Sequence, residues 1–195
     1  MTIVRKDFPG FRSAEAVPTM TVQDRYLVVR LVVHGAAVYI HNVYALVEPM
    51  ERKPFFDNLP TGSFEANASH IVCGDLNTTL CPSLNCSSGF YRHEPSRLAC
   101  LEWLSNLGVI DAWRQQHPEE RVFTGPQPRR NRLDYIVLSE TYSVRFLRIP
   151  VMHLFLTHGI IWNTSSSSRF RLNFRVMDTG NVLSRYSTIQ YLKQR

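Results

Sequence analysis

The sequence of 195 residues has no apolar run long enough to span a bilayer. Its first residues lack the basic-then-apolar layout of a secretory signal, and no internal repeat is visible. The Asn-X-Ser/Thr matches therefore carry no weight, since glycosylation requires secretion. These absences predict an intracellular protein with no membrane partner.

Cysteine is scarce, with four residues at 73, 81, 86 and 100. Their spacings fit no paired zinc-ligand pattern. Cys73 lies in an apolar run, and Cys100 lies on the apolar face of a predicted helix. We interpret the four as reduced thiols, as is usual in an intracellular protein.

Acidic residues are outnumbered, with 16 Asp and Glu against 22 Lys and Arg, so the net charge is +6. Such an excess is consistent with a polyanionic partner such as nucleic acid, although many proteins of this charge bind none. Hydrophobic residues make up 44% of the chain and charged residues 19%, which indicates a folded domain with a real core.

The pattern over residues 26–44 predicts a β-hairpin. Two runs rich in β-branched residues, 26–33 and 37–44, flank the short link His34-Gly35. Both runs are nearly continuous in apolar residues, so we expect both faces of these strands to be covered.

Elsewhere the sequence alternates between helices, strands and loops. We expect a short helix over 48–59, which Pro54 kinks or shortens, and a longer helix over 95–107 that ends at Gly108. Asp7 to Ala16 is predicted to be loop. Further strands are expected over 71–73, 121–124, 132–139, 144–149 and 158–162, a strand or short helix over 109–114, and a terminal helix over 178–195.

The stretch Gly74-Asp75-Leu76-Asn77 follows the expected strand at 71–73. In extended backbone, Asp75 and Asn77 would point the same way, with Leu76 directed into the core. A carboxylate and a carboxamide on a rigid strand end would form a small polar site. Alone, however, these four residues more often form a turn, because Asp and Asn bind their own backbone.

Other expected strand ends also carry polar groups. Asn42 and Tyr44 end the second hairpin strand, Asp134 begins the strand at 132–139, and His158 begins the last one. Each of them has a structural explanation: Asp134, for example, could pair with an arginine. The combination and its order are more specific than any one residue.

In combination, these residues resemble the endonuclease/exonuclease/phosphatase superfamily of metal-dependent phosphodiesterases. The similarity is greatest to the apurinic-type endonuclease domain of non-LTR (LINE-type) retrotransposon polyproteins. The matching motifs are Asn42-Val43-Tyr44-Ala45, Gly74-Asp75-Leu76-Asn77, Leu107 to Arg114, Phe123-Thr124, Asn131 to Ile136, and His158.

This resemblance implies an α/β fold, a two-sheet β-sandwich flanked by helices in four layers (α/β/β/α). It implies a domain over residues 1–162, followed by a linker and helical tail over 163–195. The family's first two strands, one with an Asn and one with a metal-binding Glu, are not recognisable, so we expect the N-terminal portion to be incomplete.

The resemblance also implies site roles. Asp75 would bind a Mg²⁺ or Mn²⁺ ion and position or deprotonate water, and Asn77 would orient that water and hold a phosphate oxygen. Tyr44 and Asn42 would bind or stabilise the phosphate. Asp134 would accept a hydrogen bond from His158, whose ring would stabilise the pentacovalent phosphorus.

Two departures weaken the implied metal site. The N-terminal Glu is missing, and Thr157 stands where the family has an Asp before the histidine. A hard dication held mainly by Asp75 should bind weakly. Leu46, which replaces a proline usual in the family, is a minor change.

Two functions remain open. The first is a retrotransposon-derived, DNA-directed endonuclease domain with weak or no activity; the second is a non-catalytic basic module that binds nucleic acid or protein on the same scaffold. In either case we predict that Arg129 and Arg130, in a loop at the site end, contact backbone phosphates of DNA. A solvated loop is an equal alternative for these two arginines. Nuclear residence is expected.

Overall fold

We describe the protein from a computed structural model, which places residues 3–5, 10–89, 91–125, 130–140 and 189–191. The strands are β1 (Ile3–Arg5), β2 (Phe11–Ala16), β3 (Tyr26–Val33), β4 (Ala36–Tyr44), β5 (Ser69–Asp75), β6 (Val109–Ile110), β7 (Asp134–Ser139) and β8 (Ile189–Tyr191). The α-helices are α1 (Pro49–Asp57), α2 (Pro82–Asn85), α3 (Glu94–Asn106) and α4 (Ala112–Gln116), and a 3₁₀ turn, η1, covers Pro18–Met20.

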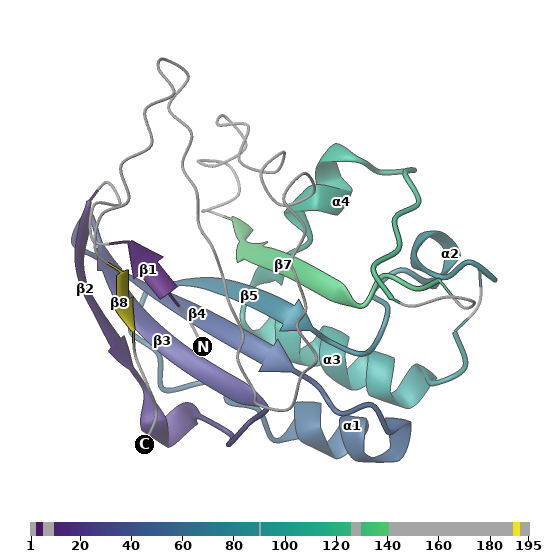
Figure 1. The fold of residues 1–195 in the computed structure, drawn as a ribbon, viewed down its shortest axis with the longest axis horizontal. Helices are drawn as coiled ribbons and strands as arrows, with labels where there is room; N and C mark the ends of the chain where they lie inside the picture. The colour runs from purple at the N-terminus through teal and green to yellow at the C-terminus, as the bar shows by residue number, and fades with distance from the viewer. Residues whose placement is uncertain (1–2, 6–9, 90, 126–129, 141–188, 192–195) are drawn as a thin grey trace.

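Six strands form one twisted sheet in the order β2-β3-β4-β5-β7-β6 (Figure 1). The pair β4–β5 is parallel, and the other neighbours are antiparallel. β1 and β8 form a separate two-stranded antiparallel sheet. The predicted α/β class is therefore confirmed, with a mixed sheet at its centre.

The β3–β4 hairpin is confirmed, and its turn explains the sequence signal. His34 and Gly35 both have positive φ, 50° and 81° respectively. A two-residue link with both residues in this region has the twist that suits two antiparallel strands, and glycine adopts it without strain.

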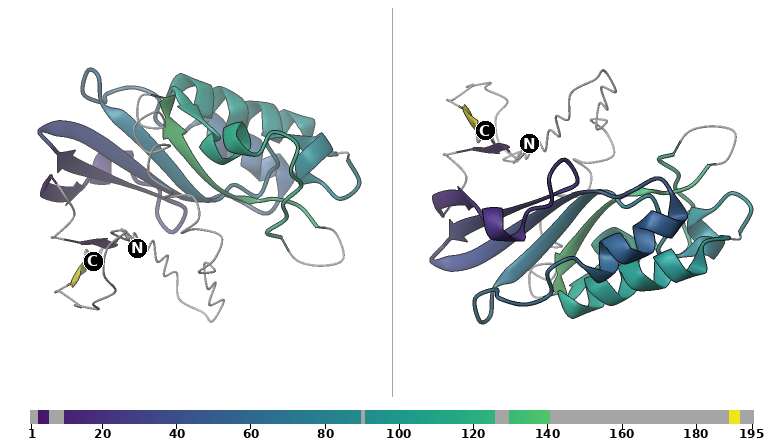
Figure 2. Two further views of the ribbon diagram at one scale, coloured as in Figure 1. Left: turned by 90° about the horizontal axis from the view of Figure 1, so that it is seen from above. Right: turned by 90° about the horizontal axis from the view of Figure 1, so that it is seen from below.

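Helices α1 and α3 pack side by side against one face of the sheet (Figure 2). Amphipathic spacing brings Phe56 of α1 and Trp103 of α3 onto Tyr26 and Val28 of β3 and Val72 of β5, all buried. Leu98 of α3 lies outside this contact and is 53% exposed. The helix continues through Pro54, which lies inside α1.

The opposite face of the sheet is apolar too. Its buried residues include Val29 and Leu31 of β3, Ile40 of β4, and Ile71 and Cys73 of β5. The central strands therefore alternate between two apolar sides, as the nearly continuous apolar runs predicted. All four cysteines are free thiols. In the described part of the chain, no helix is long and apolar enough to cross a membrane.

Three local predictions are wrong. Residues 11–16, predicted as loop, form the edge strand β2, which pairs with β3 through a register shift between Phe11 and Ser13. Residues 121–124, predicted as strand, have no regular structure. The helix predicted over 178–195 is contradicted at β8, which is extended and paired with β1. In β2 and β8, pairing with a strand far away in the chain overrides the weak local sequence pattern.

Several other predictions fall outside the described residues. These include the strands expected over 144–149 and 158–162, and with them His158 and Thr157. Arg129 and nearly all of the expected tail over 163–195 also lie outside.

Candidate functional site

The sheet register brings three of the predicted site residues into one row. Tyr44 at the end of β4 is directly opposite Asp75 at the end of β5, and Asp75 is opposite Asp134 at the start of β7. Residues opposite one another in a ladder point to the same face of the sheet. Val43 and Tyr135, their chain neighbours, face α1 and α3, so the row lies on the other face.

Asn42 joins this face one pleat further into the sheet. It is two residues before Tyr44, lies opposite Cys73, and is 4% exposed. Within the described part of the chain, its Nδ2 and the buried Oδ1 of Asp134 have no hydrogen-bond partner. Buried polar atoms are rarely left unpaired, because the lost hydrogen bond costs about 1–3 kcal/mol. The row therefore offers a donor and an acceptor to a ligand.

Asn77 is not part of the row, because its backbone is not extended. Its φ is +47°, and its backbone N–H donates to Oδ1 of Asp75 at 2.8 Å. The stretch 74–77 is thus a turn built on the Asp75 side chain, the simpler of the two sequence interpretations. One N–H of the Asn77 amide donates to the Ala45 carbonyl oxygen at 2.8 Å. Asn77 therefore joins the ends of β4 and β5.

Asp75 is partly buried, and burial raises its pKa to about 6. The Asn77 N–H opposes this rise in pKa, the negative charge of Asp134 adds to it, and the positive charge of Arg52 opposes it. Burial also raises the pKa of Asp134, against the effect of the Thr124 hydroxyl. Two neighbouring carboxylates with raised pKa values suit a site that binds a proton or a cation.

The carboxylates of Asp75 and Asp134 are the hard oxygen ligands that Mg²⁺ prefers. In the described ranges, no cluster of three His, Cys, Asp or Glu side chains could hold a metal ion. Glu15, the acid of β2, pairs with Arg30 on the helix-covered face of the sheet, away from the row. The described residues therefore fit a weakly held hard cation.

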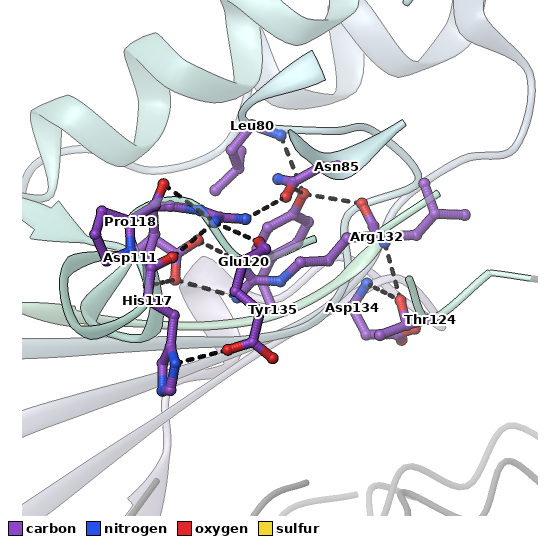
Figure 3. A network of polar contacts seen from close by, with 12 residues as sticks. Leu80, Asn85, Asp111, His117, Pro118, Glu120, Thr124, Arg132, Asp134 and Tyr135 are labelled. Atoms are coloured by element: carbon purple, nitrogen blue, oxygen red, sulfur yellow. Dashed lines mark hydrogen bonds and ion pairs between the residues drawn. The ribbon is translucent and has the colours of Figure 1, made fainter. Parts of the chain in front are cut away.

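Strand β7 begins from a dense polar network (Figure 3). The Tyr135 hydroxyl donates to the Arg132 carbonyl at 2.8 Å and accepts from Leu80 N at 3.1 Å and from Asn85 Nδ2 at 2.9 Å. It thereby ties the loop after Asn77 to the start of β7. The Thr124 hydroxyl accepts from the backbone N–H of Asp134 at 3.0 Å.

Arg132 is a structural residue in this network. Its guanidinium forms two hydrogen bonds with the Asp111 carboxylate, at 2.6 and 3.1 Å, and is 4.7 Å from the ring centre of Trp113. Of the arginines that precede Asp134, Arg132 therefore pairs with Asp111. Arg130, by contrast, is exposed, and its carbonyl accepts from Ser87 N at 2.9 Å.

Sequence patterns missed the residues that hold the site together, chiefly Arg52, Tyr91, Asn85 and Tyr135. Each contacts residues far away in the chain, so no local pattern marks it. Arg25 is another: its guanidinium lies 5.1 Å from the ring centre of Tyr44.

Gly74 allows β4 and β5 to approach at the site. Its φ is +127°, and a Cβ there would overlap the Val43 carbonyl oxygen. We expect Gly74→Ala to lower the free energy of unfolding by about 3 kcal/mol, measured by urea unfolding. Gly62→Ala is the matched control, because nothing lies within 4 Å of its Cβ position. Equal stability of the two variants would contradict the close approach.

Comparison with known proteins gives one sequence relative. The "Transposon TX1 uncharacterized 149 kDa protein" of Xenopus laevis is 28% identical over 128 residues. The match covers 62% of this chain but only 10% of the transposon protein. No family model matches the chain.

Solved structures of similar fold include an AP endonuclease from Archaeoglobus fulgidus, with a TM-score of 0.49 and 19% identity over 60% of this chain and 54% of that one. For AP endonuclease LMAP from Leishmania major the TM-score is 0.41, with 16% identity over 62% and 47%. For a humanized D. rerio TDP2 it is 0.40, with 18% identity over 67% and 53%.

This chain thus spans about half the length of these solved structures and about a tenth of the transposon protein. The relative is a transposon protein, which accords with the retrotransposon origin that the resemblance led us to expect. The mixed sheet carries Tyr44, Asp75 and Asp134 on neighbouring strand ends. The chain is thus similar in sequence to a transposon protein, and its described residues form a mixed α/β fold with polar side chains at neighbouring strand ends.

Proposed function

We propose that this endonuclease-like domain binds the phosphodiester backbone of DNA at the Tyr44–Asp75–Asp134 row and hydrolyses it slowly at most. The observation that carries the proposal is the row itself, with the unpartnered Nδ2 of Asn42 and Oδ1 of Asp134 on the same face among the described residues. Slow hydrolysis follows from the sparse set of carboxylates, which predicts weak metal binding.

In this proposal each residue of the site has its own role in hydrolysis. Asp75 accepts the proton of the attacking water, which its raised pKa favours, and Asn77 Oδ1 orients that water. The amide of Asn42 and the hydroxyl of Tyr44 donate to phosphate oxygens as negative charge develops on them. Asp75 and Asp134 would hold Mg²⁺ or Mn²⁺, and the ion would supply positive charge beside the phosphate oxygens.

The proposal also includes His158, which lies outside the described residues. A histidine N–H is the type of donor that Oδ1 of Asp134 needs. With its ring held by Asp134, His158 would stabilise charge on the phosphorus oxygens, since a carboxylate partner favours the imidazolium form. Intracellular, nuclear residence stays a prediction that accompanies the proposal.

The test is nicking of supercoiled plasmid by purified protein in Mg²⁺ or Mn²⁺, with EDTA as the control. Metal-dependent nicking that is lost in His158→Ala supports the endonuclease. Absence of nicking together with salt-sensitive DNA binding would overturn hydrolysis and favour the non-catalytic basic module. The net charge of +6 is consistent with that module.

A separate prediction concerns the loop that carries Arg129 and Arg130, here called the arginine loop. We expect the double change Arg129→Ala and Arg130→Ala to weaken DNA binding and to reduce the slope of log K against log [salt] by roughly two, because each phosphate contact contributes about 0.9. The control pairs Arg30→Ala with Lys53→Ala, which removes the same charge outside the row. An unchanged slope in the arginine-loop variant would eliminate these phosphate contacts.

A further inference from the structure

The short segment between Tyr44 and α1 has one backbone hydrogen bond to β5, from Ala45 N to the Asp75 carbonyl oxygen at 2.8 Å, and is otherwise held by side chains. Three consecutive carbonyl oxygens are bound in this way. Asn77 Nδ2 donates to Ala45 at 2.8 Å, Arg52 Nε donates to Leu46 at 2.7 Å, and Arg52 Nη2 donates to Val47. Because irregular backbone has no neighbouring ladder to satisfy it, such contacts determine where the segment lies.

Arg52 also reaches the segment that follows β5. Its third nitrogen, Nη1, donates to the Tyr91 hydroxyl at 2.7 Å, and that hydroxyl donates to the Asn77 carbonyl at 3.4 Å. Arg52, Tyr91 and Asn77 therefore connect the end of β4 to the end of β5 through side chains. We refer to these three residues as the strand-end clamp.

The chemistry of the clamp requires arginine. Arg52 is 4% exposed, and a buried cation is costly unless its N–H groups are satisfied. Each of its three nitrogens donates to a different oxygen atom, which suits the planar fork of a guanidinium with five N–H donors. A lysine ammonium at the same place could donate hydrogen bonds to only some of these three oxygen atoms.

We propose that Arg52 and Tyr91 are positioning residues for the phosphodiester site. They contact neither Asp75 nor Asp134 by a hydrogen bond among those described, and act by holding Asn77 and the segment after Tyr44 in place at the end of the row. The catalytic consequence rests on the proposed function. A misplacement of about 1 Å can reduce the rate of a chemical step about 100-fold.

The test compares Arg52→Met, Arg52→Lys and Tyr91→Phe with wild type. The control is Arg30→Met, which loses its contacts to Glu15 and Glu65 on the helix-covered side of the sheet. The first measurement is the side-chain amide signal of Asn77 by NMR, whose hydrogen-bonded proton exchanges slowly in wild type. The second is the nicking rate with Mn²⁺ across plasmid concentrations, to separate kcat from KM.

We expect Arg52→Met and Tyr91→Phe to lose the slow exchange of the Asn77 amide and to lower kcat at least about 10-fold, with KM within about twofold. Arg52→Lys should recover part of both effects, and Arg30→Met should change neither. Tyr91→Phe removes a single hydroxyl, so it tests the clamp even where Arg52→Met fails to fold.

An Asn77 amide that exchanges in Tyr91→Phe and Arg52→Lys as it does in wild type would overturn the clamp. Loss of the amide signal with an unchanged kcat would overturn its positioning role. Wild-type protein that nicks no DNA would refute the proposed hydrolysis alone, and the clamp would then be judged by the Asn77 signal.

Discussion

Asp75→Asn should abolish metal-dependent nicking and at the same time stabilise the protein at neutral pH. Loss of a general base lowers a rate by about 10²–10⁴-fold, and the change also removes the main ligand of the weak metal site. Nicking is measured as the initial rate of loss of supercoiled plasmid, and stability as the free energy of unfolding in urea.

The stabilisation follows from the raised pKa of Asp75. The folded-state pKa is about 6 against the ordinary aspartate pKa of 3.8, so the folded state binds the proton more tightly than the unfolded chain. The group therefore favours folding at pH below 3.8, and this contribution is lost as the pH rises through 6. A carboxamide removes the cost of the ionised form, about 1–3 kcal/mol at pH 7.5 for this partly buried group.

The pH dependence separates this effect from a general packing change. We expect the gain of Asp75→Asn at pH 7.5 to shrink towards zero at pH 4, where Asp75 is protonated in the folded state and begins to be protonated in the unfolded chain. Asp57→Asn is the matched control, because Asp57 lies on the surface of α1 in a pair with Lys53. A gain that is equal at both pH values, or nicking at the wild-type rate, would contradict the role given to Asp75.

Acid should destabilise the protein through a buried histidine. His41 is 0% exposed; its Nδ1 is 2.6 Å from the Tyr26 hydroxyl, and its Nε2 is 2.9 Å from Nδ1 of His70. Burial, and then the charge of His70, lower the pKa of His41 to about 3, and burial lowers that of His70 as well. The core therefore requires His41 to be neutral.

The direction of the effect follows from proton uptake. Below pH 6.5 the unfolded chain takes up a proton on His41, and the folded protein does not until about pH 3. Stability is therefore complete above pH 6.5 and declines as the pH falls towards 3, by up to about 5 kcal/mol for this side chain. We expect the urea midpoint to fall steadily over this range.

As the pH falls from 6 to 3.8, protonation of Asp75 stabilises the folded state and so opposes the loss of stability caused by His41. The measurement is therefore best made in the Asp75→Asn background. There, His41→Gln should be less stable at pH 7.5, because Tyr26 and His70 lose a well-packed partner, but its stability should depend much less on pH. His93→Gln is the control for an exposed ring. A pH profile that is equally steep with and without His41 would show that another group causes the acid loss.

Local patterns in the sequence were sufficient for much of the fold. The β3–β4 hairpin, β5, α1 and α3 were predicted near their observed bounds. The reason is that alternation, helical spacing and the His34-Gly35 turn act over a few residues. The apolar character of both sheet faces followed from the same runs.

The site was predictable only in part. The sequence by itself determined which polar residues stand at strand ends, namely Asn42, Tyr44, Asp75 and Asp134. It did not show that Asn77 adopts a left-handed conformation and binds Ala45, because an extended and a turned Asp-Leu-Asn have the same sequence. It also left β2 unrecognised, since an edge strand with half-exposed residues shows little alternation.

Tertiary structure alone decided how the site is assembled. The alignment of Tyr44 with Asp75 and of Asp75 with Asp134 depends on the register of two strand pairs whose members are 31 and 59 residues apart in the chain. The clamp by Arg52 and the pairing of Arg132 with Asp111 likewise join distant segments. Register and burial arise when the chain packs, because the free energy that selects them comes from contacts that no short window of sequence contains.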